Sequence, residues 1–514
     1  MRLWFWFLLL ATTVASLACL WFTPLPLGIP GEWTWKRITV EPDLSWNLVG
    51  VAVAVALYVA FVEAGARQLQ KGAISSRKLT IWLIGLVGAA FTWLWVVQES
   101  SPMVNRLGKS AFVLYYSSSS GYFTKARYEN PDPRKFLSEY EELMREGDVL
   151  HVGTHPPGLF LVFHGLISLC HHASWLECLD ATQPASFREA CDVITRNSVR
   201  STPLRPLLPN DRRVLWLATL LVMGIASFTV VPLFALLRRS VDSASAWRGA
   251  ALWPAIPAVA IFIPKSDVAY AFVGSLMVLA WLAATERRSI TLAVLTGLLV
   301  WLGLMMSLAF LPVVLFLAIV NWKPSPTNDH SVSDTATWLT KWNVCLPPGR
   351  CFVSAMIGFA IPTLLLGWIG GINLIAVWRL NYINHAGFYA KYTRTYWMWL
   401  LENPLELAVS AGCPVFLLAL LFVGTTLRTR RITQLPLVVG VMFVWGALWL
   451  TGKNSGEVAR LWIVFLPWLV WLAGLKLAEF NNATGRWLRP ATVILAVQLA
   501  ACALTVVRVS GFEQ

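Results

Sequence analysis

The sequence predicts an all-α, polytopic membrane protein. Of its 514 residues, 57% are hydrophobic and only 13% are charged, whereas soluble globular domains carry about 25% charged residues. The mean hydropathy is +0.61, and apolar runs recur along the whole chain, as expected when each crossing needs about 20 mainly apolar residues. A single soluble domain and an intrinsically disordered chain are both excluded by this composition.

About thirteen apolar segments are predicted to cross the membrane. The first is retained as a helix, because the Thr-Pro-Leu-Pro that follows it is a poor signal-peptidase site. Several are short for a straight crossing of about 30 Å. In order, the segments are 4–22, 48–64, 80–97, 214–237, 249–264, 267–284, 289–305, 307–321, 351–369, 405–424, 435–451, 461–478 and 490–508.

The net charge of +14 is attributed to membrane topology, and no nucleic-acid partner is expected. With the N-terminus in the cytoplasm and alternating crossings, the inner loops collect the basic excess, as the positive-inside rule requires. Inner basic residues include Arg67, Lys71, Arg77, Lys78, Arg238, Arg239, Arg248, Arg287, Arg288, Arg428, Arg430 and Arg431. A bacterial inner membrane is the preferred location, because the loops carry no eukaryotic retention signal.

Four regions follow from this topology. The apolar run 159–170 is only about twelve residues long, a length typical of an interfacial helix, so it is expected to be a juxtamembrane helix inside one large outer loop. The regions are an N-terminal helix pair (1–79), a core with the large outer loop 98–213 (80–320), a cytoplasmic loop (321–350), and a C-terminal transmembrane region with an outer aromatic loop 373–404 (351–514).

The large outer loop contains a compact polar motif. Asp148 precedes His151 and His155, and two prolines follow His155 directly. Prolines fix the backbone at a first helical turn, so they would aim His155 at one place. An ordinary proline-started interfacial helix and a metal site formed by the two histidines are both alternatives here.

A second polar point interrupts an apolar stretch, at Lys265 and Asp267. Either charge costs roughly 2.5–3.5 kcal/mol in lipid on insertion scales, so both must face each other or an outer cavity. A local ion pair in a turn at the interface is the simpler interpretation. The functional interpretation is an anionic group facing the same cavity as His155.

Two further outer segments carry candidate binding residues. Lys453, Glu457 and Arg460 precede an aromatic helix, and outward Lys and Arg side chains suit either a phosphate or lipid head groups. The aromatic loop holds Arg379, His385 and Arg394 among several Trp and Tyr residues. This mixture suits either carbohydrate binding or an interfacial aromatic belt.

Cysteines and standard motifs add little. Cys178 and Cys191 share the large outer loop, and a disulfide between them in an oxidising compartment and two free thiols are both open alternatives. No cysteine spacing predicts a zinc site. The sequence contains no Walker loop, Rossmann glycine motif, His-Glu-x-x-His or Gly-x-Ser-x-Gly. Nucleotide hydrolysis and metalloprotease chemistry are therefore unsupported.

The order of these elements resembles the GT-C superfamily of membrane glycosyltransferases, especially its protein O-mannosyltransferase and aminoarabinose-transferase branch. In that family a first large outer loop ends in a Pro-Pro motif, and His155-Pro156-Pro157-Gly158 looks like it. A following helix ends at an outer acidic residue, which Asp267 matches, and Arg460 to Pro467 is similar to the family's Arg-aromatic-Pro helix start. The resemblance covers about residues 80–320 well and 351–478 loosely.

One family residue is missing. The family's presumed base is an Asp shortly before a Tyr and an Ala, and the matching stretch here runs from Ser117 to Ser120 and then to Tyr122, with no acid. Another carboxylate would have to serve. We rank Asp267 first, Asp148 second and Glu99 third.

The resemblance implies inverting transfer of a sugar from a polyprenyl-phosphate donor to a lipid, glycan or protein acceptor on the outer face. Lys265, Lys453 or Arg460 would stabilise the departing phosphate, and His155 would orient a phosphate or hydroxyl. Members differ in whether they use a divalent metal such as Mg²⁺ or Mn²⁺, and both alternatives stay open. A transporter or flippase with the same charged residues as ligands, and a catalytically degenerate homologue, are the competing expectations.

Overall fold

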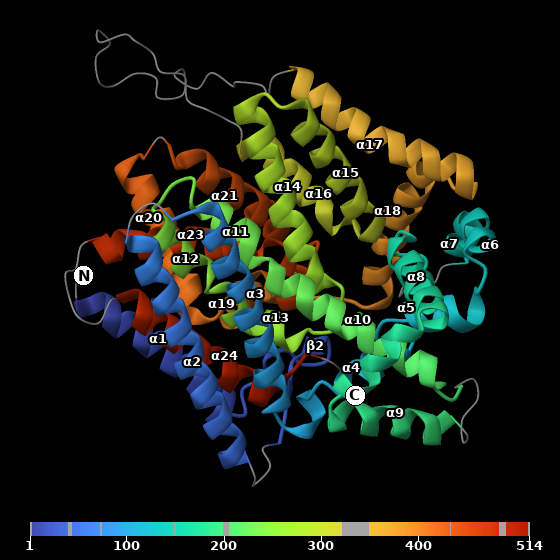
Figure 1. The fold of residues 1–514 in the computed structure, drawn as a ribbon, viewed down its shortest axis with the longest axis horizontal. Coiled ribbons are helices and arrows are strands. Elements are labelled where there is room, and N and C mark those ends of the chain that lie inside the picture. Colours follow the sequence, from blue (N-terminus) through green and yellow to red (C-terminus); the bar gives the residue numbers. More distant parts are fainter. Residues whose placement is uncertain are drawn as a thin grey trace.

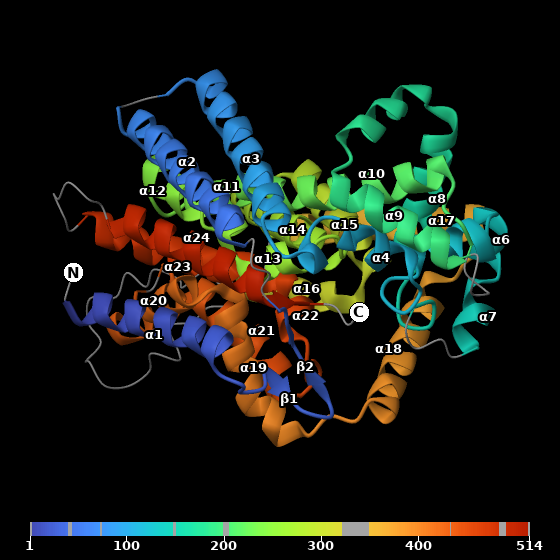
Figure 2. The same cartoon turned by 90° about the horizontal axis from the view of Figure 1, so that it is seen from below.

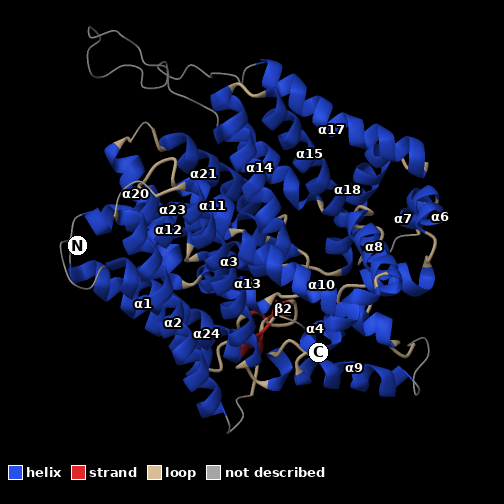
Figure 3. Cartoon of the chain, in the orientation of Figure 1, coloured by secondary structure: helices blue, strands red, loops and turns tan. Residues whose placement is uncertain are grey.

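A computed structural model shows a molecule built almost entirely of helices, and within the residues that the structure describes the strands form two short pairs (Figure 3). This agrees with the predicted all-α class. The structure describes residues 3–39, 44–71, 74–146, 151–198, 205–320, 349–431, 433–482 and 490–511. Among the sequence candidates, Asp148 lies outside the described residues, as does almost all of the expected cytoplasmic loop 321–350.

The N-terminal region forms three long helices and a short strand segment. The helices are α1 (Leu3–Phe22), α2 (Leu44–Gln70) and α3 (Ser76–Glu99). Between α1 and α2, β1 (Gly28–Ile29) pairs antiparallel with β2 (Trp33–Thr34). The next strand, β3 (Lys36–Arg37), pairs with β4 (Val509–Ser510) near the C-terminus, so the two ends of the chain are joined.

The large loop after α3 folds into a group of short helices at one side of the molecule, drawn in cyan and green (Figure 1). Its α8 contains the apolar run predicted to be a juxtamembrane helix, and it bends by 103° into the following turn. The helices are α4 (Lys109–Tyr115), α5 (Tyr122–Thr124), α6 (Pro133–Ser138), α7 (Tyr140–Arg145), α8 (Gly158–His172) and α9 (Ala185–Ser198), with 3₁₀ turns at Met103–Asn105 and Ser174–Thr182 and a π turn at Lys125–Glu129.

The core that follows contains a broken helix where one continuous crossing was predicted over 249–264. Pro254 and Pro257 each lack a backbone donor and lie in the first turn of a new helical segment, so this stretch becomes the end of α12, a 3₁₀ turn and α13. The core elements are α10 (Pro209–Phe228), α11 (Val230–Leu237), α12 (Ser243–Ala250), a 3₁₀ turn (Trp253–Ala255), α13 (Pro257–Ile261), α14 (Asp267–Arg287), α15 (Ile290–Met306), a 3₁₀ turn (Leu308–Phe310) and α16 (Leu311–Val320).

The C-terminal region also differs from the prediction at one crossing. The segment 405–424 is predicted to be one crossing, but it falls on two helices, α19 and α20, which meet at 114°. Gly412 at φ +83° ends α19, and Pro414 lies in the first turn of α20. The elements are α17 (Gly349–Gly370), α18 (Leu374–Lys391), α19 (Tyr396–Ala411), α20 (Cys413–Thr429), α21 (Leu435–Leu450), α22 (Val458–Leu461), a 3₁₀ turn (Ile463–Phe465), α23 (Leu466–Asn482) and α24 (Pro490–Arg508).

Eight helical stretches within the described residues are long and apolar enough to cross a membrane, and up to ten if each of two bent pairs counts as one span. These long apolar helices support an integral, polytopic membrane protein. Helices such as α17 fit a lipid environment, because only 11% of its apolar window is buried inside the protein. The thirteen predicted crossings include the segments that form α15 and α21, and each of these two helices is shorter than 18 residues.

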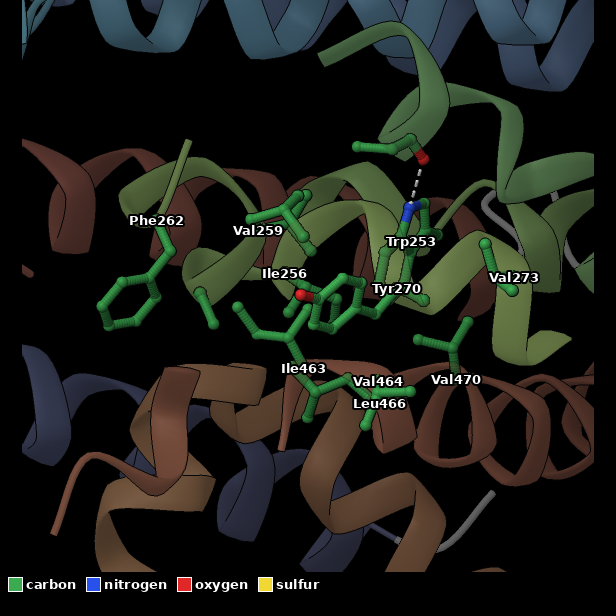
Figure 4. Packing of buried hydrophobic residues seen from close by; sticks show 14 of the residues in the cluster. Trp253, Ile256, Val259, Phe262, Tyr270, Val273, Ile463, Val464, Leu466 and Val470 are labelled. Atoms are coloured by element: carbon green, nitrogen blue, oxygen red, sulfur yellow. Dashed lines mark hydrogen bonds between the residues drawn. The ribbon is translucent and has the colours of Figure 1, made fainter. Parts of the chain in front are cut away.

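The core places α14 against the segment around α22 and α23. Figure 4 shows Tyr270 of α14 beside Ile463, and Val273 beside Val470, with all of these side chains buried. Trp253 closes the other side and donates its indole N–H to the Ala226 carbonyl over 2.7 Å. This packing holds together two segments that are almost 200 residues apart and whose first turns carry charged residues.

Candidate functional site

Four segments that the topology prediction assigns to the outer side converge at one place. They are the turn before α5, the turn before α8, the first turn of α14 and the turn leading into α22. Lys265 donates from Nζ to the Ser119 carbonyl, and His151 hydrogen-bonds through Nε2 to the Ser117 carbonyl. The serine-rich stretch, which lacks the expected acid, therefore joins the other segments through its backbone.

Tyr122 lies at the centre of this convergence and is 8% exposed. Its ring contacts His155, with centroids 5.7 Å apart, and Phe160 of α8, with centroids 5.0 Å apart. The preceding Gly121 has a φ of +70°, and a Cβ there would lie 2.6 Å from Cδ2 of His151. Only glycine fits this turn, because both the left-handed backbone and the close ring exclude a side chain.

The charges around Tyr122 come from different segments. Burial raises the pKa of the Tyr122 hydroxyl; the Asp267 carboxylate raises it further, and the Arg460 guanidinium opposes both. An electrostatic effect of this kind requires proximity. Asp267 and Arg460 therefore act on the same buried phenol, although 193 positions separate them in the sequence (460 − 267 = 193).

Asp267 opens α14, where the helix dipole favours a negative charge. Its side chain is partly exposed. Within the described part of the chain, its carboxylate has no hydrogen-bond or ion-pair partner, unlike Glu457, which forms an ion pair with Arg460 at 2.6 Å. Asp267 is thus an acid beside two cations that remains available to a substrate.

Lys265 lies two residues before Asp267 and is surrounded by protein. Burial lowers the pKa of its ammonium group to about 7, the Arg460 cation lowers it as well, and Asp267 and Glu457 oppose the shift. Lysine responds to burial in this way because its compact charge loses hydration. Near neutral pH, Lys265 is therefore a group that both holds and releases a proton.

His155 is neutral at physiological pH. Burial lowers its pKa to about 3, and His151, Arg460 and His385 lower it further, while a backbone hydrogen bond opposes them. Its Nδ1 lies 3.3 Å from the His151 carbonyl and 3.2 Å from the Thr154 hydroxyl. When Nδ1–H donates to that carbonyl, Nε2 is an acceptor for a ligand hydroxyl.

Arg460 belongs to the short helix α22, which follows a turn of three left-handed residues: Gly452, Gly456 and Glu457, with φ of +63°, +81° and +58°. Its Nε is buried and has no hydrogen-bond partner among the described residues. A guanidinium with a donor to spare can bind a phosphate through a second nitrogen.

Among the other sequence candidates, His385 acts electrostatically on His155, and the remaining ones have other neighbours. Lys453 is exposed and lies 4.6 Å above the Tyr382 ring. Burial lowers the pKa of His385, and the Lys453 ammonium group lowers it further. Arg379 is exposed. Arg394 donates to the Glu32 carbonyl over 2.8 Å, so it ties the segment before α19 to the turn between β1 and β2.

Glu99, the third-ranked base, has a structural role. Its Oε1 accepts from the Leu107 amide at 2.9 Å and from the Ser186 hydroxyl at 3.0 Å. These bonds hold the large loop on the end of α3. Cys178 and Cys191 are both free, so the disulfide considered for this loop is not formed. Cys191 is buried on the apolar face of α9, where it packs as a small hydrophobic residue.

Several residues of the site have no sequence signal of their own. Tyr270 lies one turn into α14, 3% exposed, with its hydroxyl 3.2 Å from the Ser266 hydroxyl. Glu406 reaches the backbone beside Arg460 from the middle of α19. Tyr122 could have been found from its place after Gly121 in the motif that resembles the family pattern. Within the described residues, no group of three or more His, Cys, Asp or Glu side chains is arranged to hold a metal ion.

Comparison with known proteins adds no assignment. No protein-family model matches the chain. No curated protein matches it either.

Proposed function

We propose that the protein is a membrane glycosyltransferase that moves a sugar from a polyprenyl-phosphate donor to an acceptor hydroxyl at the outer face of the membrane. The observation that carries this proposal is the Asp267 carboxylate, which has no hydrogen-bond or ion-pair partner among the described residues and lies beside Lys265 and Arg460. The order of the motifs along the chain, which resembles the GT-C superfamily, supports the same function. The acceptor would be a lipid, a glycan or a protein, and the expected location is a bacterial inner membrane with a cytoplasmic N-terminus.

The proposed reaction needs one base and one cationic site for a leaving phosphate. Asp267 accepts the proton of the acceptor hydroxyl as its oxygen attacks the anomeric carbon. The bond between the anomeric carbon and the phosphate oxygen breaks at the same time, and the polyprenyl phosphate leaves with the electron pair and the negative charge. Attack opposite the leaving group inverts the anomeric configuration.

In this proposal, two cations stabilise that developing charge. Arg460 offers a planar guanidinium with an unused buried donor, and Lys265 offers a compact ammonium. In a partly buried site such groups stabilise charge more than in water. The neutral His155 accepts a hydrogen bond from a sugar or acceptor hydroxyl and so orients it. No step of this scheme depends on a metal ion.

The missing acid of the serine stretch fits this assignment. Backbone carbonyls of Ser117 and Ser119 bind His151 and Lys265, so this stretch orients the site without supplying a carboxylate. The proposal therefore gives the role of base to Asp267. Asp148 is a second candidate, outside the described residues, and Glu99 is assigned to the framework.

The proposal is tested by transfer assays on purified protein with a panel of polyprenyl-phosphate sugars. We expect transfer by the wild type and its loss, by at least about 100-fold, in Asp267→Asn and Arg460→Ala, as for removal of a base or an oxyanion donor. Matched controls are Asp192→Asn and Arg239→Ala, which break ion pairs of 2.8 and 2.9 Å away from the site. Both controls should retain activity.

Two outcomes would overturn the assignment. Saturable uptake into vesicles, with no transfer from any donor, would favour a transporter or flippase that uses the same charged residues. Absence of transfer, uptake and donor binding would favour a catalytically degenerate homologue.

A further inference from the structure

The segment between α1 and α2, residues 28–38, contacts the candidate site although it lies more than 200 positions from Lys265 and Arg460. It is fixed at both ends: β1 pairs with β2 (Figure 2), and β3 pairs with β4 near the C-terminus. Trp35 stands between β2 and β3 and is only 6% exposed. A tryptophan held in this way is a rigid, well-placed group.

Trp35 touches the segment that leads to Lys265. Its ring meets the Phe262 ring edge-on, with centroids 6.3 Å apart and planes at 86°, a favoured aromatic geometry. The Phe262 carbonyl accepts from the Lys265 amide over 2.7 Å. Movement of Trp35 would therefore be transmitted to the turn that carries the lysine.

Trp35 also reaches the segment that carries Arg460, through Glu406 of α19. The Trp35 indole N–H donates to Oε1 of Glu406 over 3.0 Å, and the Ala459 amide donates to the same oxygen over 3.1 Å. Glu406 and Ala459 are 7% and 1% exposed. Because a buried amide without a partner is costly, the Glu406 carboxyl group fixes the backbone of the four-residue helix α22, one position before Arg460.

The segment 28–38 also contacts α19 through Glu32. The Glu32 carboxylate accepts from the Thr395 amide at 2.9 and 3.0 Å and from the Trp399 indole at 2.6 Å. Trp399 is fully buried, and a Cβ on Gly456 would lie 3.4 Å from its ring. Glu32 thus fixes the helix that supplies Glu406.

We propose that Trp35 and Glu406 are positioning residues for the candidate site. They hold the Lys265 turn and the Arg460 turn in one fixed relation, so that both cations meet the same anionic group. This inference rests on the proposed function for its ligand, the phosphate of a lipid-linked sugar. Through Trp35, the N-terminal region then helps to position the residues of the candidate site, in addition to contributing a pair of helices.

The first test measures transfer kinetics in the purified full-length protein. Glu406→Leu should lower kcat/KM by about 30- to 100-fold, mainly through KM for the donor, since an error of about 1 Å in placing a binding group costs roughly this much. Glu406→Gln keeps the acceptor oxygen and should stay within about threefold of the wild type, because one neutral hydrogen bond contributes modestly. In an Arg460→Ala background, Glu406→Leu should cost little more.

A matched tryptophan pair separates positioning from general packing. Trp35→Phe keeps the ring contact but loses the donor to Glu406, and should raise KM. Trp216→Phe loses an equally buried indole donor, to the Thr182 hydroxyl at 2.8 Å, and should leave KM unchanged. Equal effects of the two substitutions would overturn the proposal, as would unchanged kinetics in Glu406→Leu.

The second test does not depend on catalysis. Phenylglyoxal modifies accessible arginines, and mass spectrometry of the peptide that contains Arg460 follows its rate. Glu406→Leu should increase that rate several-fold, whereas Glu406→Gln and Trp216→Phe should not. If the wild type transfers no sugar, the proposed function fails, and the labelling alone decides: an increased rate supports the positioning role and an unchanged rate overturns it. If Glu406→Leu does not fold, Trp35→Phe is labelled in its place.

Discussion

The protonation of Lys265 offers the most specific prediction. Burial and the nearby Arg460 lower its pKa to about 7, whereas an exposed lysine titrates near 10.4. If the ammonium form stabilises the departing phosphate, kcat/KM must fall as pH rises through this value. Substitution by arginine, which stays protonated above pH 12, should remove the fall.

The magnitude follows from the titration. With a pKa of about 7, one half of the molecules carry the charge at pH 7 and about one tenth at pH 8. Above the pKa, the wild-type kcat/KM should therefore drop about tenfold per pH unit. The Lys265→Arg profile should stay flat over the same range, although its absolute value will be lower because the longer side chain fits the turn less well.

The assay is initial-rate transfer at donor concentrations below KM, from pH 6 to 9, since kcat/KM reports the free enzyme. Thermal unfolding over the same range gives an independent check. The unfolded chain binds more protons at this lysine between pH 7 and 10, so the wild type should gain stability with rising pH relative to Lys265→Met. A wild-type profile that is flat up to pH 9, or a fall that persists in Lys265→Arg, would refute the reasoning.

Three further predictions concern the same site. Gly121→Ala should lower the free energy of unfolding by about 1–3 kcal/mol in a denaturation experiment, because the left-handed backbone and the nearby His151 ring both exclude a side chain. Tyr122→Phe should leave the melting temperature unchanged, because the ring packing remains. It should lower kcat at least severalfold, because the lost hydroxyl lies near the Asp267 and Arg460 charges; an unchanged kcat would exclude a role for that hydroxyl. Arg460→Lys should raise the donor KM about tenfold or more, since lysine does not reproduce bidentate phosphate binding, and an unchanged KM would remove Arg460 from the phosphate site.

The sequence was sufficient to predict the architecture where apolar length alone determines it. Long uninterrupted runs such as those of α2 and α24 each form one helix, and the short run at 159–170 forms α8, which bends by 103° into the following turn. The errors lie at breaks in a single apolar run. Pro254 and Pro257 divide one expected crossing into short pieces, and Gly412 bends another, because hydropathy averages conceal backbone effects of single residues.

Part of the candidate site was also within reach of the sequence. Asp267, Lys265, His155 and Arg460 stood out because a charge or a Pro-Pro motif is conspicuous in apolar surroundings. Lys453 and Glu99 stood out for the same reason but face other neighbours, since prominence in the sequence does not specify proximity.

Other residues were beyond sequence reasoning. The hydrogen bond between Glu406 and Ala459 spans more than 50 positions of the sequence, and the one between Trp35 and Glu406 spans more than 370. Trp35 and Glu406 owe their proposed role to these two bonds. A Trp in a short loop and a Glu within a mainly apolar helix carry no local pattern that would connect them to Arg460. Such long-range pairs are visible only in the folded chain.

The central claim is that Asp267 accepts a proton while a lipid phosphate leaves. The most direct measurement follows one radiolabelled polyprenyl-phosphate sugar in the purified wild type and in Asp267→Asn, and quantifies both the glycosylated acceptor and the released polyprenyl phosphate. The account predicts equal amounts of the two products in the wild type, an inverted anomeric centre, and neither product in Asp267→Asn. Transfer by Asp267→Asn at the wild-type rate would contradict it.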